Sequence, residues 1–331
     1  MSDSGSFGDS SEITWAVDSV TVYGTLVRPV GEGPFPAVVL VAGSGPTDRD
    51  WNSALLPGSN GSGRLIAEQL ARAGFASVRY DKRGIGPHGR EQLPELLGKV
   101  TMAGFADELA GAVRAVADQE FVRGDRIFAL GNSEGTLHAL NYQLGKPAIP
   151  LTGLVLVSPP GRAVGTVARW QLAAQAATVP EGDAMLALYD AAVARFQAGE
   201  PAAPDPALPE GVRQLVGSLE TPFNLPFTRE LWTADPSELL GRVDAPVLIV
   251  IGDKDVQVDR VADGGPLQHA AEGHPNVSFL FPENMNHILK QELRPRSELT
   301  PGAVTTSYNS PDAILDPEAM ADILAWLDAR R

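Results

Sequence analysis

Residues 127–136 read Ile-Phe-Ala-Leu-Gly-Asn-Ser-Glu-Gly-Thr, and this stretch decides the fold. Its first four residues form an apolar run that predicts a buried strand. Gly131, Ser133 and Gly135 follow with the spacing Gly-x-Ser-x-Gly, and an apolar helical pattern begins at Leu137. A strand, a sharp turn and a helix in this order predict a nucleophile elbow, with the serine projecting from the edge of a sheet. A chance match in a loop is the alternative, and the flanking strand and helix argue against it.

Short apolar runs recur on both sides of this stretch, and helical patterns separate them. They lie at residues 37–41, 76–80, 154–157, 247–251 and 277–281. Strands that alternate with helices predict an α/β fold with a mostly parallel central sheet and helices on both faces. Alternating residues 13–17 and 20–27 predict a hairpin before the first of these strands.

Residues 161–243 interrupt this rhythm, because their apolar residues recur at helical spacing. We expect a helical cap inserted into a core domain made of residues 12–160 and 244–331. The insertion is rich in aromatic residues. We expect most of them to pack the insertion on itself, and a few to face Ser133 and form the substrate pocket. They are Trp170, Tyr189, Phe196, Phe223, Phe227 and Trp232. Residues 1–11 are rich in Ser, Gly and Asp and predict a flexible tail.

The composition excludes several classes of function. The 331 residues include 41 acidic and 26 basic side chains, a net charge of −15, which argues against nucleic acid and anionic membranes as partners. No cysteine is present, so a disulfide, a thiol nucleophile and a thiolate metal site are excluded. The chain shows neither a signal peptide nor an apolar run long enough to cross a bilayer. We expect a cytoplasmic monomer or homodimer.

A serine nucleophile needs a base, and the base needs an acid that orients it. In a sheet of this kind the order along the chain is serine, acid, histidine, each on a loop at the carboxyl edge. His287 follows the last strand and is the expected base. Asp253 and Asp255 both follow the preceding strand. We prefer Asp255 because it lies deeper in the turn, while Asp253 could instead cap a turn or helix.

Two backbone N–H groups are needed to bind the oxyanion of the tetrahedral intermediate. We expect one from Glu134, directly after the nucleophile, and one from Ser44 in the Gly-Ser-Gly loop after the strand at 37–41. An ordinary glycine-rich turn would have the same sequence as this loop.

Charged residues of opposite sign alternate in two nearby loops. They are Asp48, Arg49, Asp50, Asp81, Lys82 and Arg83. We expect ion pairs within these loops, and neither a metal nor a cofactor.

With these motifs in this order, residues 13–327 resemble the α/β-hydrolase superfamily. Residues 43–50 and 285–290 resemble, more narrowly, a group of capped bacterial serine carboxylesterases placed near the serine aminopeptidases. The chain differs from the commonest pattern at Ala42 and Asn132, where many members have histidine.

The resemblance implies hydrolysis of carboxylic esters by Ser133, His287 and Asp255 through an acyl-enzyme. The expected partner is a small-molecule ester, neutral and of short to medium chain length, because the acidic chain shows no basic cluster for a polyanion such as acyl-CoA. A thioesterase or peptidase with the same triad is one alternative. A non-catalytic protein that uses the pocket as a receptor is another.

Overall fold

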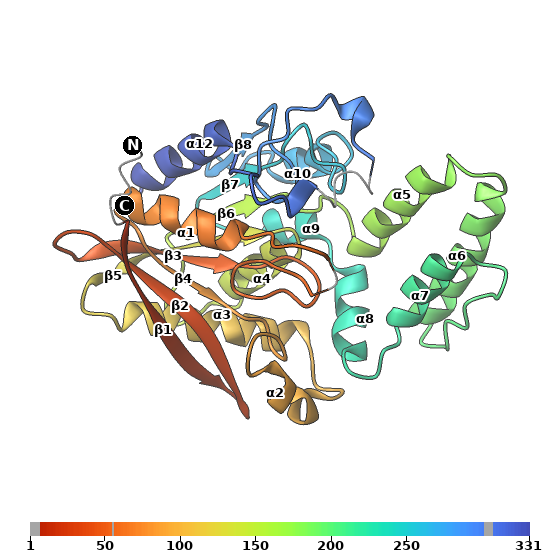
Figure 1. Ribbon diagram of the computed structural model, residues 1–331, viewed down its shortest axis with the longest axis horizontal. Coiled ribbons are helices and arrows are strands. Elements are labelled where there is room, and N and C mark those ends of the chain that lie inside the picture. The colour runs from red at the N-terminus through yellow and green to blue at the C-terminus, as the bar shows by residue number, and fades with distance from the viewer. Residues whose placement is uncertain (1–6, 55, 301–306) are drawn as a thin grey trace.

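The computed structural model describes residues 7–54, 56–300 and 307–331 (Figure 1). Within them, one sheet of eight strands has the order β1-β2-β4-β3-β5-β6-β7-β8. The strands are β1 (Gly8–Val17), β2 (Val20–Pro29), β3 (Phe35–Val41), β4 (Ala76–Tyr80), β5 (Val122–Asn132), β6 (Gly153–Val157), β7 (Val247–Val250) and β8 (Val277–Leu280). β2 pairs antiparallel with β1 and β4, and the other pairings are parallel. The predicted mostly parallel sheet is confirmed.

Helices cover both faces of this sheet, as predicted. Those of the core are α1 (Ser62–Arg72), α2 (Gly89–Leu96), α3 (Met102–Ala117), α4 (Glu134–Leu144), α10 (Gly264–Ala270) and α12 (Pro317–Asp328), with the short 3-10 helix η1 (Arg296–Glu298). Alternate residues of a strand point to opposite faces. Val38 and Leu40 of β3 accordingly pack in the cluster that contains α1 and α12, and Val39 and Val41 pack in the cluster that contains α3 and α4.

The first hairpin is longer than predicted. β1 begins at Gly8 and pairs with β2 from Gly8↔Pro29 to Val17↔Val20, so residues 8–11 belong to a strand and the predicted tail 1–11 is wrong there. Residues 1–6 lie outside the described residues. Asp9, Ser10 and Ser11 are exposed on this edge strand, and such polar side chains have the same composition as a tail.

The chain between β6 and β7 is helical, and all of it is described. It contains α5 (Val164–Ala176), α6 (Gly182–Gln197), α7 (Glu210–Ser218), α8 (Leu225–Thr233) and α9 (Pro236–Leu240). Figure 1 shows α5, α6 and α7 as a lobe that stands apart from the sheet. This lobe has a core of its own around Tyr189 and Phe196. Leu240 of α9 packs instead in the core cluster that contains α3 and α4. The chain therefore rejoins the core a few residues before 243, the predicted end of the insertion.

No helix in the described part of the chain is both long and apolar enough to traverse a bilayer.

Candidate active site

Ser133 stands at a strained turn between β5 and α4. Its backbone has φ 51° and ψ −120°, a conformation that costs free energy in a residue with a side chain and that a crowded turn can impose. A Cβ at Gly131 would lie 2.6 Å from the carbonyl oxygen of Gly135, and one at Gly135 would overlap the carbonyl oxygen of Val41. Only glycine fits at these two positions, so the Gly-x-Ser-x-Gly spacing follows directly from the packing of the turn.

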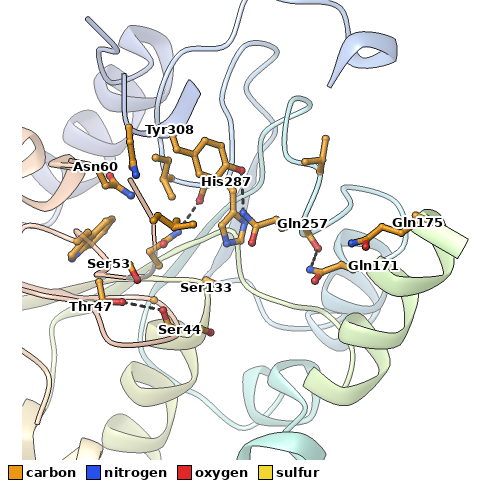
Figure 2. A pocket seen from close by; sticks show the side chains of 18 residues that line it. Ser44, Thr47, Ser53, Asn60, Ser133, Gln171, Gln175, Gln257, His287 and Tyr308 are labelled. Carbon is orange, nitrogen blue, oxygen red and sulfur yellow. Dashed lines mark hydrogen bonds between the residues drawn. The ribbon is translucent and has the colours of Figure 1, made fainter. Parts of the chain in front are cut away.

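His287 and Asp255 form a buried pair beside Ser133. Nδ1 of His287 lies 2.8 Å from Oδ2 of Asp255, and Figure 2 shows the imidazole directed toward Ser133. The other oxygen of Asp255 accepts hydrogen bonds from the backbone N–H groups of Gln257 (2.8 Å) and Val258 (3.0 Å). The carboxylate is therefore held on both sides and is fully buried.

Asp253, the alternative acid, lies elsewhere. Its carboxylate accepts a hydrogen bond from Arg260 at 2.8 Å in an exposed ion pair. The structure thus brings Asp255, and not Asp253, to the imidazole.

Two asparagine side chains hold the His287 loop in place. Oδ1 of Asn286 accepts from the N–H groups of Ile288 (3.1 Å) and Lys290 (3.0 Å). Nδ2 of Asn132 donates to the carbonyl oxygen of His287 at 2.8 Å. The role of Asn132 was not predicted, although its place next to the nucleophile was the available signal.

The two expected oxyanion donors are close to Ser133. Ser44 and Ser133 line the same pocket, and Glu134 is the first residue of α4. A residue at this helix position has no intrahelical acceptor for its N–H, and the helix N-terminus favours negative charge. A Cβ on Gly43 would meet Oδ1 of Asn132 at 3.1 Å, so the loop before Ser44 lies against the residue before the nucleophile.

Lys82 lies beside the elbow and contacts both Glu134 and the loop that contains Gly43. Its Nζ lies 2.6 Å from Oε1 of Glu134 and 3.0 Å from the carbonyl oxygen of Gly43. His138 Nε2 lies 3.1 Å from the same Glu134 oxygen. Burial alone would raise the pKa of Glu134, but Lys82 and His138 outweigh it and lower that pKa to about 2. Burial lowers the pKa of His138, which favours the neutral ring.

The loop charges pair only partly as predicted. Arg49 binds Asp81 at 2.6 Å and Arg79 binds Asp50 at 2.7 Å. Lys82 and Arg83, however, pair with carboxylates of distant helices, Glu134 and Glu108, and not with the aspartates of their own loops. In the described residues, no group of three potential ligand side chains could hold a metal.

A pocket of about 420 Å³ lies over Ser133 and His287 (Figure 2). Most of its other wall residues are uncharged and polar: Ser44, Thr47, Ser53, Asn60, Asn132, Gln171, Gln175, Gln257, Tyr308 and Asn309. Its apolar surface comes from Trp51, Leu56, Ala174, Val256 and Ile288. Among the described residues that line it, none is Asp, Glu, Lys or Arg.

The six aromatic residues of the insertion do not line this pocket, so the expectation that some would face Ser133 is wrong. Tyr189, Phe196 and Trp232 pack within the lobe. Phe227 packs against Phe105 of the core, and Phe223 packs at the edge of the same cluster. Trp170 lies under the guanidinium of Arg162. Helical spacing identifies an apolar face but not the neighbour that covers it.

Comparisons with known proteins identify the family and the fold. A model described as the alpha/beta hydrolase family matches residues 38–288. The chain is 26% identical over 275 residues to the esterase EstD of Thermotoga maritima, an alignment that spans 80% of this chain and 57% of that protein.

Two solved structures share the fold at low identity. The esterase PF2001 of Pyrococcus furiosus superposes with a TM-score of 0.57 at 17% identity, over 98% of this chain and 91% of that one. The proline iminopeptidase of Mycobacterium smegmatis gives a TM-score of 0.55 at 17% identity, over 97% and 98%.

Proposed function

Because this chain belongs to the alpha/beta hydrolase family, we propose that it is a serine carboxylesterase with Ser133 as nucleophile, His287 as base and Asp255 as orienting acid. One observation carries the proposal. Ser133, at the elbow, and the imidazole of His287 line the same pocket. Nδ1 of this imidazole is hydrogen-bonded to the buried carboxylate of Asp255. The similarity to an esterase gives independent support.

The proposed reaction proceeds through an acyl-enzyme. Ser133 Oγ attacks the ester carbonyl carbon while His287 Nε2 takes its proton, and the N–H groups of Ser44 and Glu134 bind the oxyanion. The intermediate collapses, the C–O bond to the alcohol breaks, and His287 returns the proton to the leaving oxygen. Water then attacks the acyl group by the same steps and releases the acid. Asp255 keeps Nδ1 protonated, so that Nε2 is the free base.

The pocket favours a small neutral substrate. Its wall offers hydroxyl and amide groups and, among the described residues, no formal charge apart from what His287 takes up in the reaction. A charged group would be desolvated there without a partner. We therefore propose short- to medium-chain esters, whose acyl chain would contact the apolar side chains of the wall and whose hydroxyl or carbonyl groups its polar side chains would bind.

The peptidase and thioesterase alternatives need charges that the described residues of this wall do not supply. An aminopeptidase must hold the ammonium group of its substrate, which calls for a carboxylate. An acyl-CoA thioesterase must bind phosphates, but Arg49, Lys82, Arg83 and Arg162 are each paired with a carboxylate.

The test is a screen of p-nitrophenyl esters from acetate to dodecanoate, beside an alanine p-nitroanilide and acetyl-CoA. We expect the highest kcat/KM for a short or medium ester, with no turnover in Ser133→Ala. Faster turnover of the anilide would indicate a peptidase, faster turnover of acetyl-CoA a thioesterase, and no turnover of any substrate a receptor.

A further inference from the structure

Lys82 bridges the Gly43–Ser44 peptide and the side chain of Glu134, and Ser44 and Glu134 are the two residues proposed as oxyanion donors. Its Nζ donates to the carbonyl oxygen of Gly43 at 3.0 Å. That carbonyl and the N–H of Ser44 belong to one peptide unit, which is planar, so a contact that fixes one also aims the other. The same Nζ lies 2.6 Å from the carboxylate of Glu134, the residue that supplies the second N–H.

This contact lies inside the protein. Lys82 is 7% exposed and Glu134 4% exposed, and Lys82 does not line the pocket. The ring centroid of Phe105 is 4.9 Å from Nζ, and His138 approaches the same carboxylate at 3.1 Å. The pair is therefore screened little by solvent, unlike an exposed salt bridge.

A cation on a peptide carbonyl also strengthens the N–H at the other end of that peptide. Hydrogen bonds in a chain polarise one another, most strongly where the dielectric constant is low. Donors that are fixed before the reaction stabilise the developing charge at no cost of reorganisation. A link between the Gly43–Ser44 peptide and the start of α4 would fix both donors relative to Ser133.

We propose that Lys82 is a positioning residue of the oxyanion hole, which aims and polarises the Ser44 N–H and ties it to Glu134. This inference rests on the proposed function, because it requires an oxyanion to form at Ser133. It assigns Lys82 a role beyond structural support of its loop.

The next residue of the chain offers a matched control. Arg83 is 8% exposed and forms a buried ion pair with Glu108 of α3. Its guanidinium lies over the same Phe105 ring at 5.5 Å, and its other partner is the carbonyl oxygen of Gly104. Arg83→Met therefore breaks an equally buried pair in the same loop without removing a contact to Gly43 or Glu134.

The experiment compares Lys82→Met and Arg83→Met on the best p-nitrophenyl ester of the wild-type protein. We expect Lys82→Met to lower kcat about 100-fold with KM changed less than about threefold, because the contact serves only the transition state. Arg83→Met should keep kcat within about threefold. The Ki of a trifluoromethyl ketone, which forms an oxyanion with a serine nucleophile, should rise by the same factor as kcat/KM falls.

A double variant separates positioning from a buried unpaired charge. Lys82→Met leaves the Glu134 carboxylate without its cation, whereas Lys82→Met with Glu134→Gln removes both charges and keeps the Glu134 backbone. The double variant should fold at least as stably as Lys82→Met and remain about 100-fold slow.

Recovery of kcat in the double variant would overturn the proposal, as would equal losses in Lys82→Met and Arg83→Met. In either case wild-type ester turnover would leave the proposed esterase function standing. A wild-type protein without turnover would overturn both.

Discussion

The two walls of the pocket are built differently. On the core wall, Asp255 accepts two backbone hydrogen bonds in addition to the contact with His287, and Asn132 and Asn286 fix the His287 loop. On the lobe wall, which the helical insertion forms, α5 presents Gln171 and Gln175, and Gln175 is exposed. Figure 2 shows these two side chains entering from the opposite side, with the Gln171 side-chain amide bonded to the Gln257 carbonyl oxygen at 2.8 Å.

We infer from this difference that the two walls have different roles. Groups that must meet a transition state within fractions of an ångström are held by the sheet edge, where neighbouring backbone fixes them. Groups that only choose among substrates can sit on a helix of a separate lobe. Changes in the core wall should then act on kcat, and changes in the lobe wall on KM and on the choice of ester.

The largest effect is expected for the triad. Ser133→Ala or His287→Ala should lower kcat by roughly 10⁶-fold, because the remaining oxyanion donors and substrate binding account for only part of the catalysis. Thermal unfolding should stay close to wild type. The double variant should be little worse than either single variant, since these residues act as a unit, and additive losses in ester turnover would contradict the assignment.

The two aspartates should differ by several orders of magnitude. Asp255→Asn should cost roughly 10⁴ in kcat by favouring the wrong tautomer of His287. Asp253→Asn, which alters only an exposed ion pair, should change kcat less than about threefold. Steady-state kinetics of both variants test this, and the reverse ranking would move the acid to Asp253.

Low pH should lower the free energy of unfolding through protonation of Glu134. Its pKa is about 2 in the folded protein against an ordinary value of 4.5, so its contribution to stability is present above pH 4.5 and is lost as pH falls toward 2. Wild type should lose about 2 kcal/mol of unfolding free energy from this group by pH 3. Urea unfolding at pH 6 and pH 3 measures the loss, and Glu134→Gln should show a correspondingly smaller one. The same loss in both proteins would contradict the pairing with Lys82.

The smallest effect is expected on the lobe wall. Gln175→Leu should raise KM for a hydroxylated ester and lower it for p-nitrophenyl hexanoate, by about three- to tenfold, because an exposed amide of the pocket becomes an apolar side chain. The kcat should hardly change. Gln214→Leu on α7, an exposed glutamine of the same lobe away from the pocket, is the control. A large fall in kcat in Gln175→Leu would mean that the lobe wall takes part in the chemistry.

The sequence predicted two features best: the repeated apolar strands and the crowded turn at the elbow. Apolar runs such as β3 and β5 carry the strand signal by themselves, and the elbow leaves no choice but glycine at two positions. The order of serine, acid and histidine then locates the loops in which the site residues lie.

The partners of buried charges were harder to predict. Lys82 and Arg83 have aspartates close by in sequence, yet the fold supplies Glu134 and Glu108, which lie 52 and 25 residues further along the chain. The aromatic residues of the insertion posed the same problem, because Tyr189 and Phe196 indicate burial but not the neighbours that cover them. Tyr308 and Asn309 line the pocket from the end of a helical turn whose sequence shows no periodic apolar pattern.

The central claim is that Ser133 is an activated nucleophile, and labelling with a fluorophosphonate tests it most directly. Intact mass and peptide mapping of the treated wild-type protein should show one adduct, located on Ser133. Ser133→Ala should take up no label and His287→Ala should react orders of magnitude more slowly, while Asp253→Asn should react like wild type. A wild-type protein that stays unlabelled, or that carries the label on another residue, would contradict the account.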